Sequence, residues 1–394
     1  MIVGVPKEIL PNEQRVAALP ETVHEYVKMG FDVLVESGAG AGALQSNKEY
    51  EEAGATIAAD AEALFSQADV ILKVKQPWLN QQAGKDEVDM MREGTVLITF
   101  LHPAAPPSHE TIRALAHRKI TALTMDSVPR TPRAQPMDAL TSMSTVTGYK
   151  AVLIAANRFP KFIPILGTAI GTIKPARFLV VGTGVVGLQA IATAKRLGGS
   201  IQAVDIREDA RKEADSVGAK IGGFEVPAEL AVGEGGYAKA LPPEWMDKER
   251  EALGPLVEQA DIVILSALVP GEVAPLLVTE EAVRRMKPGS VIVDVAIDQG
   301  GNCAVTEPGG EVVREGVCVL GLWNIPGSMP VHASWLYAAN LLNYVKNLFK
   351  NGPGALDLDD DIVARSLVTH QGKIVHQGTL KAMRNASAAA EKRE

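Results

Sequence analysis

The sequence predicts an α/β protein made of two doubly wound lobes. Three observations lead to this prediction: apolar, β-rich runs alternate with helical patterns, the alternation extends over much of the 394 residues, and a glycine-rich motif lies near the middle of the chain. Alternating strands and helices are typical of parallel sheets. A chain of this length is too long for one ordinary core, so we expect two domains.

The N-terminal portion of the chain predicts a sheet of its own. Helical patterns at Glu21–Met29 and Ser108–His117 separate short apolar runs that have the composition of buried strands. These runs are Ile2–Val5, Asp32–Val35, Val70–Val74, Val96–Phe100 and Ile120–Leu123. Their alternation with helical patterns favours βαβ units.

The remaining strands belong to a second lobe. Candidate strands follow the glycine-rich motif at Ile201–Val204, Ile262–Ser266, Val291–Val295 and Val317–Leu320. A helical pattern at His332–Phe349 comes next, and too few residues follow it to form another domain. We therefore expect this helix to return the chain to the first lobe, which gives a discontinuous N-terminal lobe of residues 1–140 plus 330–394. The second lobe is 141–329, with a cleft between the two.

Composition excludes several classes of function. The chain is 46% hydrophobic and 22% charged, and it has no apolar stretch of the ~18 residues that cross a bilayer. Its N-terminus lacks the features of a signal peptide, so we expect a cytoplasmic protein. A net charge of −8 argues against binding nucleic acid. Cys303 and Cys318 are too few for a thiolate metal site, and we predict two reduced thiols and no metal.

The glycine-rich motif indicates a dinucleotide site in a Rossmann-like lobe. Gly182, Gly184 and Gly187 form G-x-G-x-x-G between the apolar run Phe178–Val181 and a helix-forming stretch. Glycines permit a tight turn and the approach of backbone N–H groups to a pyrophosphate at a helix N-terminus. Asp205 follows the next strand, where an acid accepts hydrogen bonds from the adenosine ribose and repels a 2′-phosphate. The predicted cofactor is NAD(H), and the predicted contacts are Gly182, Gly184, Val185, Val186, Gly187, Asp205 and Ile206.

Further motifs resemble the alanine dehydrogenase and transhydrogenase superfamily over essentially the whole chain. They include Val5–Glu8, Asn12–Ala17, Ile191–Gly198, Gly235–Lys239 and Gly300–Cys303. The segment Val128–Asp138 is similar to a loop of the soluble NAD(H)-binding alpha component, domain I, of proton-translocating transhydrogenase. The resemblance implies two Rossmann-like lobes and NAD(H) as the cofactor.

The same resemblance implies a polar cluster at the nicotinamide end of the cofactor. Its members are Arg130, Gln135 and Asp138, and Thr141 offers a hydroxyl to the same region. Guanidinium and amide donors orient a carboxamide and phosphates, and such positioning is most of what hydride transfer needs. The alternative interpretation is a surface Arg–Asp pair of negligible energy.

Three other segments are implicated by resemblance. The glycine-rich loop Ala231–Lys239 is expected to fold over the bound nucleotide and to place Tyr237 on it; an ordinary surface loop is the alternative. Ala267 and Leu268, in the segment Ala267–Gly271, follow a strand and are expected near the nicotinamide. Asn324 leaves the last strand of the lobe and is a candidate for a hydrogen bond near the same ring.

A second set of residues suits an alanine dehydrogenase better. Arg15 and Lys75 are candidates to clamp a substrate carboxylate, and His102 is a candidate to exchange a proton with a carbonyl oxygen. Asp298 would stabilise an iminium or ammonium group. The alternative is that these positions have no catalytic role.

The resemblance therefore implies a Re/Si-specific NAD(P)⁺ transhydrogenase alpha subunit. Such a subunit binds NADH and passes hydride to NADP⁺ held on a partner subunit, while membrane-embedded subunits translocate protons. It is expected to form a homodimer peripheral to the cytoplasmic face of the inner membrane, without nucleic acid. An NAD-dependent alanine dehydrogenase is the second hypothesis, and a cofactor-binding protein without catalysis is the third.

Overall fold

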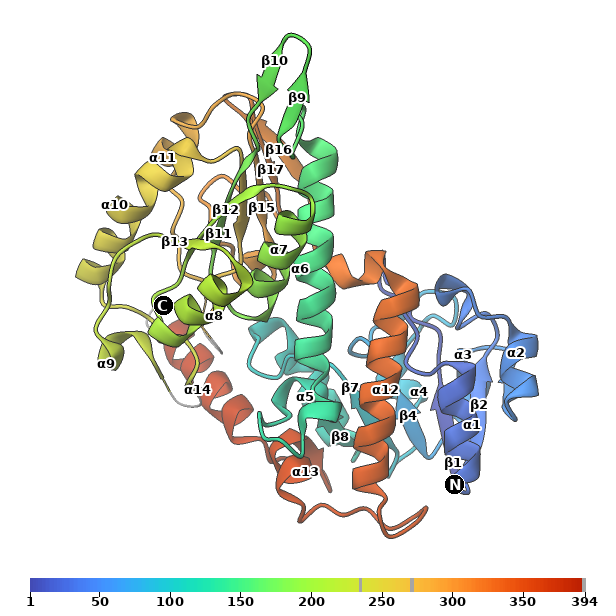
Figure 1. The fold of residues 1–394 in the computed structure, drawn as a ribbon. Helices are drawn as coiled ribbons and strands as arrows, with labels where there is room; N and C mark the ends of the chain where they lie inside the picture. The colour runs from blue at the N-terminus through green and yellow to red at the C-terminus, as the bar shows by residue number, and fades with distance from the viewer. Residues whose placement is uncertain (234–235, 270–272, 392–394) are drawn as a thin grey trace. The chain divides into compact units, whose positions relative to one another are not determined.

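The computed structural model describes residues 1–233, 236–269 and 273–391 (Figure 1). The chain divides into two compact units: unit 1 is Met1–Met143 with Pro326–Glu394, and unit 2 is Ser144–Ile325. Each unit has one large sheet in which most neighbouring strands are parallel. The predicted fold class, two doubly wound α/β lobes of which the N-terminal one is discontinuous, is confirmed.

The sheet of unit 1 has the strand order β19-β18-β8-β7-β4-β1-β2-β3. Its strands are β1 (Ile2–Val5), β2 (Asp32–Glu36), β3 (Thr56–Ala58), β4 (Val70–Leu72), β7 (Val96–Thr99), β8 (Thr121–Thr124), β18 (Leu367–His370) and β19 (Lys373–Ile374). Strand β18 pairs antiparallel with β8, and β19 pairs antiparallel with β18. The C-terminal segment thus extends the sheet by an antiparallel edge, which the sequence analysis did not predict.

The sheet of unit 2 has the strand order β13-β12-β11-β14-β15-β17-β16. Its strands are β11 (Arg177–Val181), β12 (Ser200–Val204), β13 (Lys220–Ile221), β14 (Ile262–Leu265), β15 (Val291–Asp294), β16 (Glu311–Arg314) and β17 (Val317–Leu320). All pairs are parallel except that of β16 with β17.

Helices connect these strands. In unit 1 they are α1 (Pro20–Lys28), α2 (Asn47–Glu52), α3 (Ala61–Phe65), α4 (Glu87–Met90), α5 (His109–His117), α12 (Pro330–Leu348), α13 (Asp361–Ser366) and α14 (Gln377–Glu391). In unit 2 they are α7 (Val185–Arg196), α8 (Glu208–Val217), α9 (Ala228–Ala231), α10 (Pro243–Gln259) and α11 (Glu280–Arg284), and α6 (Ala139–Arg158) crosses the boundary. None of the helices in the described part of the chain has the length and hydropathy of a membrane span.

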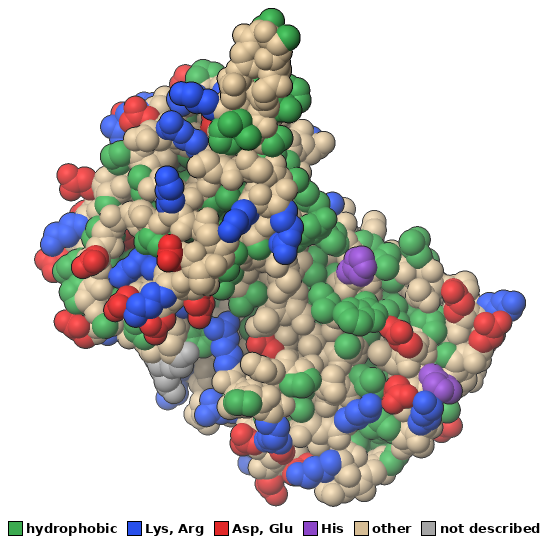
Figure 2. Space-filling view, in the orientation of Figure 1, with side chains coloured by type: hydrophobic (Ala, Val, Ile, Leu, Met, Phe, Trp, Pro, Cys, Tyr) green, Lys and Arg blue, Asp and Glu red, His purple; other side chains and the backbone are tan. Residues whose placement is uncertain are grey.

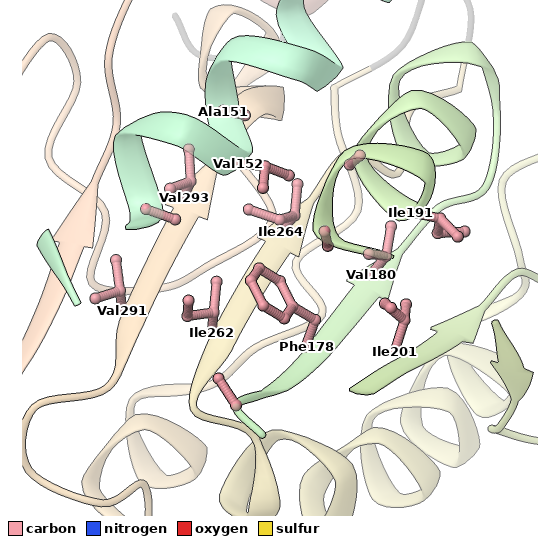
Figure 3. Packing of buried hydrophobic residues seen from close by; sticks show 14 of the residues in the cluster. Ala151, Val152, Phe178, Val180, Ile191, Ile201, Ile262, Ile264, Val291 and Val293 are labelled. Atoms are coloured by element: carbon pink, nitrogen blue, oxygen red, sulfur yellow. The ribbon is translucent and has the colours of Figure 1, made fainter. Parts of the chain in front are cut away.

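Helices cover both faces of the unit 2 sheet. On one face, Ala151 and Val152 of α6 and Ile191 of α7 pack over apolar residues of β11, β14 and β15 (Figure 3). On the other face, Leu253 and Val257 of α10 pack over the same strands. Strands buried on both faces are expected to be almost wholly apolar, as Ile262–Leu265 is.

Two short antiparallel pairs lie outside the large sheets. One is β5 (Leu79–Asn80) with β6 (Lys85–Asp86), and the other is the hairpin of β9 (Leu166–Thr168) and β10 (Gly171–Ile173). The hairpin projects beyond its sheet (Figure 1), and the side chain of Ile170 at its tip is 100% exposed. The sequence analysis did not predict this hairpin.

Candidate dinucleotide site

The glycine motif lies where the unit 2 sheet changes direction. From β11 the chain proceeds outward through β12 and β13, and then returns to β14 on the other side of β11. Ligands of open α/β sheets bind at the carboxyl ends of the strands beside such a point. Gly182 and Ser266 directly follow these two strands, and the Ser266 hydroxyl donates a hydrogen bond of 2.9 Å to the Gly182 carbonyl.

The three glycines of the motif are required for different reasons. Gly182 has φ +84°, and a Cβ there would lie 2.7 Å from the Ala267 nitrogen. A Cβ on Gly187 would lie 2.0 Å from the Gly182 carbonyl oxygen. Gly184, by contrast, has φ −70°, and no atom lies within 4 Å of the position that a Cβ would occupy there. Packing within the protein therefore explains Gly182 and Gly187 but does not explain Gly184.

The space beside Gly184 suits an anionic ligand. Gly184 is the N-cap of α7, and no side chain caps this helix end. The first N–H groups of the helix, which include those of Val185 and Val186, have no intrahelical acceptor and carry partial positive charge. A pyrophosphate accepts hydrogen bonds from such groups when glycine lets it approach the backbone. These residues therefore fit a dinucleotide such as NAD(H), which would supply the reacting nicotinamide when bound.

Asp205 is already occupied by hydrogen bonds within the protein. Its Oδ1 accepts from the Arg207 backbone N–H at 2.9 Å and from Arg207 Nε at 3.0 Å. Its Oδ2 accepts from the Thr183 N–H at 2.8 Å, the Thr183 hydroxyl at 3.2 Å and Arg207 Nη2 at 2.9 Å. A carboxylate offers about four lone-pair positions, so these donors fill it. The sequence analysis noted Arg207 but did not foresee this bidentate pair.

The predicted nucleotide loop lies beside Arg207. Arg207 Nη1 donates to the Gly236 carbonyl at 3.3 Å, and the Gly233 N–H donates to the Tyr237 carbonyl at 2.8 Å. A bridge between Val232 and Ala238 closes the loop at its base. Tyr237 is half-buried. Residues 234–235 of this predicted loop lie outside the described residues.

A buried network that the sequence analysis missed holds the segment after β14. The Asn302 side chain accepts from the Ala267 N–H at 3.0 Å and donates to the Ala267 carbonyl at 2.9 Å. Asp294, at the end of β15, accepts from the Asn302 N–H at 2.8 Å. Ala267 and Leu268 are half-buried, and residues 270–271 of the predicted segment lie outside the described residues. Because Asn302 is distant in sequence from Ala267, only its place in the Gly-Gly-Asn motif hinted at a role.

Asn324 lies after β17, at the same end of the unit 2 sheet. It is half-buried and has φ +54°, in the left-handed region that asparagine tolerates better than most residues. The backbone thus turns sharply at this position. A role for Asn324 at the nicotinamide stays a prediction.

In unit 1, two members of the predicted polar cluster contact each other. The Asp138 carboxylate accepts from the Thr141 N–H at 2.9 Å and from its hydroxyl at 2.6 Å, which caps the start of α6. Arg130 and Gln135 are exposed. Exposed donors remain accessible to a ligand, so their predicted role at the nicotinamide stays a prediction.

A different arginine anchors this loop. Arg133 Nη1 donates to Asp360 at 2.7 Å and to Asn347 at 3.1 Å, and its Nη2 pairs with Asp361. Burial alone would raise the pKa of Asp360, but hydrogen bonds from Arg133 and Asn347 hold it well below its usual range. The sequence analysis missed this anchor, because its acidic partners lie in a distant part of the chain.

The residues that suit an alanine dehydrogenase are tied to neighbours of their own. Arg15 is buried and pairs with Glu13 through Nη2 at 2.5 Å and Nε at 2.8 Å. His102 Nδ1 lies 2.9 Å from Asp126 Oδ1. Burial raises the pKa of Asp126, but the charge and hydrogen bonds of His102 lower it to about 2. Lys75 is half-buried in unit 1, and Asp298 is exposed in unit 2.

Comparison with known proteins identifies the family. Residues 4–147 match the alanine dehydrogenase/PNT N-terminal domain, and residues 151–377 match the alanine dehydrogenase/PNT C-terminal domain. The chain belongs to the alanine dehydrogenase/PNT family. Both activities in the family name are those of oxidoreductases.

Individual relatives represent both branches of the alanine dehydrogenase/PNT family. The chain is 45% identical to an NAD(P) transhydrogenase subunit alpha of Rhodospirillum rubrum, over 95% of this chain and 98% of the relative. It is 32% identical to alanine dehydrogenase of Methanococcus maripaludis, over 100% of this chain and 99% of the relative. The crystal structure of transhydrogenase from Sinorhizobium meliloti matches with a TM-score of 0.83 and 39% identity, over 95% of this chain and 100% of that one. The resemblance predicted from the motifs is confirmed.

Proposed function

We propose that this chain is the NAD(H)-binding alpha subunit of a proton-translocating NAD(P)⁺ transhydrogenase, which passes hydride from NADH to NADP⁺ bound on a partner subunit. The observation that carries the proposal is the 45% identity to a transhydrogenase alpha subunit along almost the whole of both chains. The open space at Gly184, which protein packing does not explain, supports a dinucleotide as the ligand.

The chain's own residues bind and orient the cofactor in this proposal. The backbone from Gly182 to Gly187 holds the pyrophosphate at the start of α7, and Asp205 with Ile206 lies at the adenosine half. Tyr237, Ala267, Leu268 and Asn324 line the rest of the site in unit 2. Arg130, Gln135, Asp138 and Thr141 orient the nicotinamide, and the hydride acceptor belongs to the partner.

An activity assay with and without a partner tests the proposal. The purified chain is mixed with NADH and an NADP⁺ analogue, first alone and then with the NADP(H)-binding component of a transhydrogenase. We expect reduction of the analogue only in the second mixture. Absence of transfer in both mixtures, with a partner shown to be active beside its own alpha subunit, contradicts the proposal.

An alanine dehydrogenase is the second candidate, favoured by the His102–Asp126 pair and by 32% identity over the whole chain. His102 is a potential proton donor beside a carboxylate that keeps it oriented. Rapid oxidation of NADH by pyruvate and ammonium, with this chain as the sole protein, would establish this function instead.

Arg130 is the residue whose loss should separate transfer from binding. We expect Arg130→Ala to lower the rate of hydride transfer roughly 10- to 100-fold, because a positioning donor is lost, with little change in ADP-ribose affinity. Stopped-flow transfer and calorimetric binding measure the two effects. Arg113→Ala, at another exposed arginine of unit 1, serves as the control. A wild-type transfer rate in Arg130→Ala removes that residue from the site.

The hairpin β9–β10 supports a homodimer. An isolated two-stranded hairpin is marginally stable in water, yet the segment that contains this one also exposes Phe162, Ile165 and Ile170 by 58%, 64% and 100%. Apolar side chains are visible along it (Figure 2). We expect Ile170→Asp to shift the chain from dimer to monomer in sedimentation at micromolar concentration. Leu44→Asp, at another exposed apolar residue, should leave the dimer intact; a dimer in both variants contradicts this role.

Membrane-embedded subunits complete the proposed enzyme. Transhydrogenase alpha subunits are among the relatives of this chain, and none of the described helices could itself span a bilayer. The proposal therefore puts the chain peripherally, at the cytoplasmic face of the inner membrane, and assigns proton translocation to its partners.

A further inference from the structure

Helix α10 carries a carboxyl group at a position where its pattern requires an apolar residue. Glu249, Leu253 and Val257 are spaced four residues apart and are all buried, so they form one stripe along the helix. Leu253 and Val257 pack in the core on one face of the unit 2 sheet. Glu249 is 5% exposed. A glutamate in such a stripe is costly unless it serves a purpose.

The position of Glu249 along α10 brings it to the end of β12. Val204, the residue before Asp205, packs in the same apolar cluster as Leu253. Ile206, the residue after Asp205, packs in a second cluster with Met246. Glu249 lies on α10 between Met246 and Leu253, and thus between the two clusters that flank Asp205. The two acidic side chains therefore face the same region.

Glu249 has no partner in the described part of the chain, either by hydrogen bond or by ion pair. Its pKa is raised to about 7, chiefly by burial and further by the charge of Asp205, while the charge of Arg250 acts in the opposite direction. Buried polar groups are normally hydrogen-bonded, and an exception calls for an explanation such as an absent ligand. The group has both the capacity and the need for a partner.

Asp205 cannot easily be that site's sole acceptor. Thr183 and Arg207 already use its lone pairs. A ribose bound at the end of β12 brings hydroxyl donors that need acceptors. The unpartnered carboxyl near Asp205 is that of Glu249.

We propose that Glu249 is a specificity-determining residue of the dinucleotide site, where it hydrogen-bonds the hydroxyls of the adenosine ribose and repels a 2′-phosphate. This inference rests on the proposed function, because it assumes that a dinucleotide binds at Gly184. Arg207 keeps Asp205 in place and neutralises its charge, and Glu249 then supplies the negative charge that rejects NADP(H).

Binding measurements on two variants and one control test the inference. Wild type, Glu249→Gln, Glu249→Leu and Glu251→Gln are titrated calorimetrically at pH 8 with ADP-ribose, NADH and NADPH. Glu251 is exposed on the same helix, so its variant keeps the helix and changes the same net charge. Circular dichroism verifies that each variant is folded, and Glu249→Gln preserves side-chain size if the leucine variant fails to fold.

We expect Glu249→Leu to bind ADP-ribose roughly tenfold more weakly, since a hydrogen bond to a charged group is lost. Glu249→Gln should improve NADPH binding relative to NADH roughly tenfold, because the repulsive charge is removed. Glu251→Gln should match wild type. A role limited to stabilising α10 would not change the ratio of NADPH to NADH affinity.

Two negative outcomes are distinguishable. If wild type binds NADH and ADP-ribose but both Glu249 variants retain its affinities and its selectivity, the role of Glu249 is wrong and the proposed function stands. If wild type binds neither ligand, the proposed function fails and this inference fails with it.

Discussion

The two sheets of this molecule have the same change of direction but fill it differently. In unit 1 the chain proceeds from β1 through β2 and β3 and returns to β4 beside β1, just as β11 and β14 are related in unit 2. In unit 1 the Glu8 carboxylate, after β1, accepts from the Val74 N–H at 2.6 Å. In unit 2 the corresponding strand ends are joined by glycine backbone and one serine hydroxyl.

Charge accounts for the contrast at these strand ends. Lys73, directly after β4, is fully buried and lies 3.5 Å from Glu8 and 3.0 Å from Glu87. The carboxylates raise the pKa of Lys73 against the effect of its burial. Tyr337 of α12 donates to the Lys73 carbonyl at 2.8 Å. Unit 1 thus satisfies its strand ends with its own side chains, whereas in the described part of unit 2 Gly184 stays open and Glu249 unpartnered.

The difference shows that a doubly wound sheet creates a location for a ligand but not the ligand site itself. Side chains that complete each other's hydrogen bonds turn the location into a structural cluster. Glycines and an unsatisfied acid keep it available for binding. The same comparison predicts that substitutions in the first location change stability and that substitutions in the second change binding.

Breaking the buried charge cluster of unit 1 should have the largest effect. We expect Lys73→Met to lower the free energy of unfolding by about 3–5 kcal/mol, because two buried carboxylates lose their counter-charge. Urea denaturation followed by circular dichroism measures the loss. Lys7→Met, at an exposed lysine of the preceding turn, should cost less than about 0.5 kcal/mol.

The comparison also requires that the folded Lys73→Met variant bind NADH as wild type does. A large loss of NADH affinity with little change in stability would mean that the unit 1 cluster belongs to the ligand site.

The two glycines of unit 2 should show the reverse behaviour. Gly184→Val introduces a side chain into space that no protein atom uses, so we expect an unchanged unfolding midpoint and a loss of NADH affinity of roughly 100-fold, as the pyrophosphate loses its close approach to the backbone. Gly187→Val places a Cβ 2.0 Å from the Gly182 carbonyl oxygen and should destabilise the protein by about 1–3 kcal/mol. Calorimetry and thermal unfolding separate the two. Equal NADH affinity in Gly184→Val and wild type would exclude this loop as the pyrophosphate site.

The sequence was informative where the signal is local. The glycine motif, the flanking strands and the acid at position 205 lie within one short βαβ segment, so their spacing alone predicts their arrangement. Glu249 could not be predicted in this way, because its proximity to Asp205 depends on how α10 packs on the sheet. A glutamate in an otherwise apolar stripe was the available signal, and it acquires meaning only once the buried face of α10 is known.

Long-range pairs were equally out of reach. Lys73 and Lys75 are two residues apart, and the sequence analysis selected Lys75 as the functional one. Nothing local distinguishes a lysine that pairs with Glu8 and Glu87 inside the core from a half-buried neighbour. The antiparallel strand β18 was missed for a similar reason: four residues of strand pattern near the end of the chain become a strand only because β8 presents an edge to them.

The smallest expected effect is a pH dependence of stability that belongs to Glu249. The pKa of Glu249 is raised from 4.5 to about 7 in the folded chain, so between these values the folded state holds a proton that the unfolded state has released. The free energy of unfolding therefore decreases as pH rises through this range, by at most about 3 kcal/mol. Glu249→Gln lacks the titrating group and escapes this decrease.

Urea midpoints at pH 5 and pH 8 should thus converge in Glu249→Gln relative to wild type, whereas Glu251→Gln should keep the wild-type dependence. Saturating NADH should narrow the difference between wild type and Glu249→Gln at pH 8, because the bound ribose gives the carboxylate its missing partner. A pH dependence that is identical in wild type and Glu249→Gln would mean that this carboxyl is satisfied without a ligand, and the contrast between the two sheets would then rest on Gly184 alone.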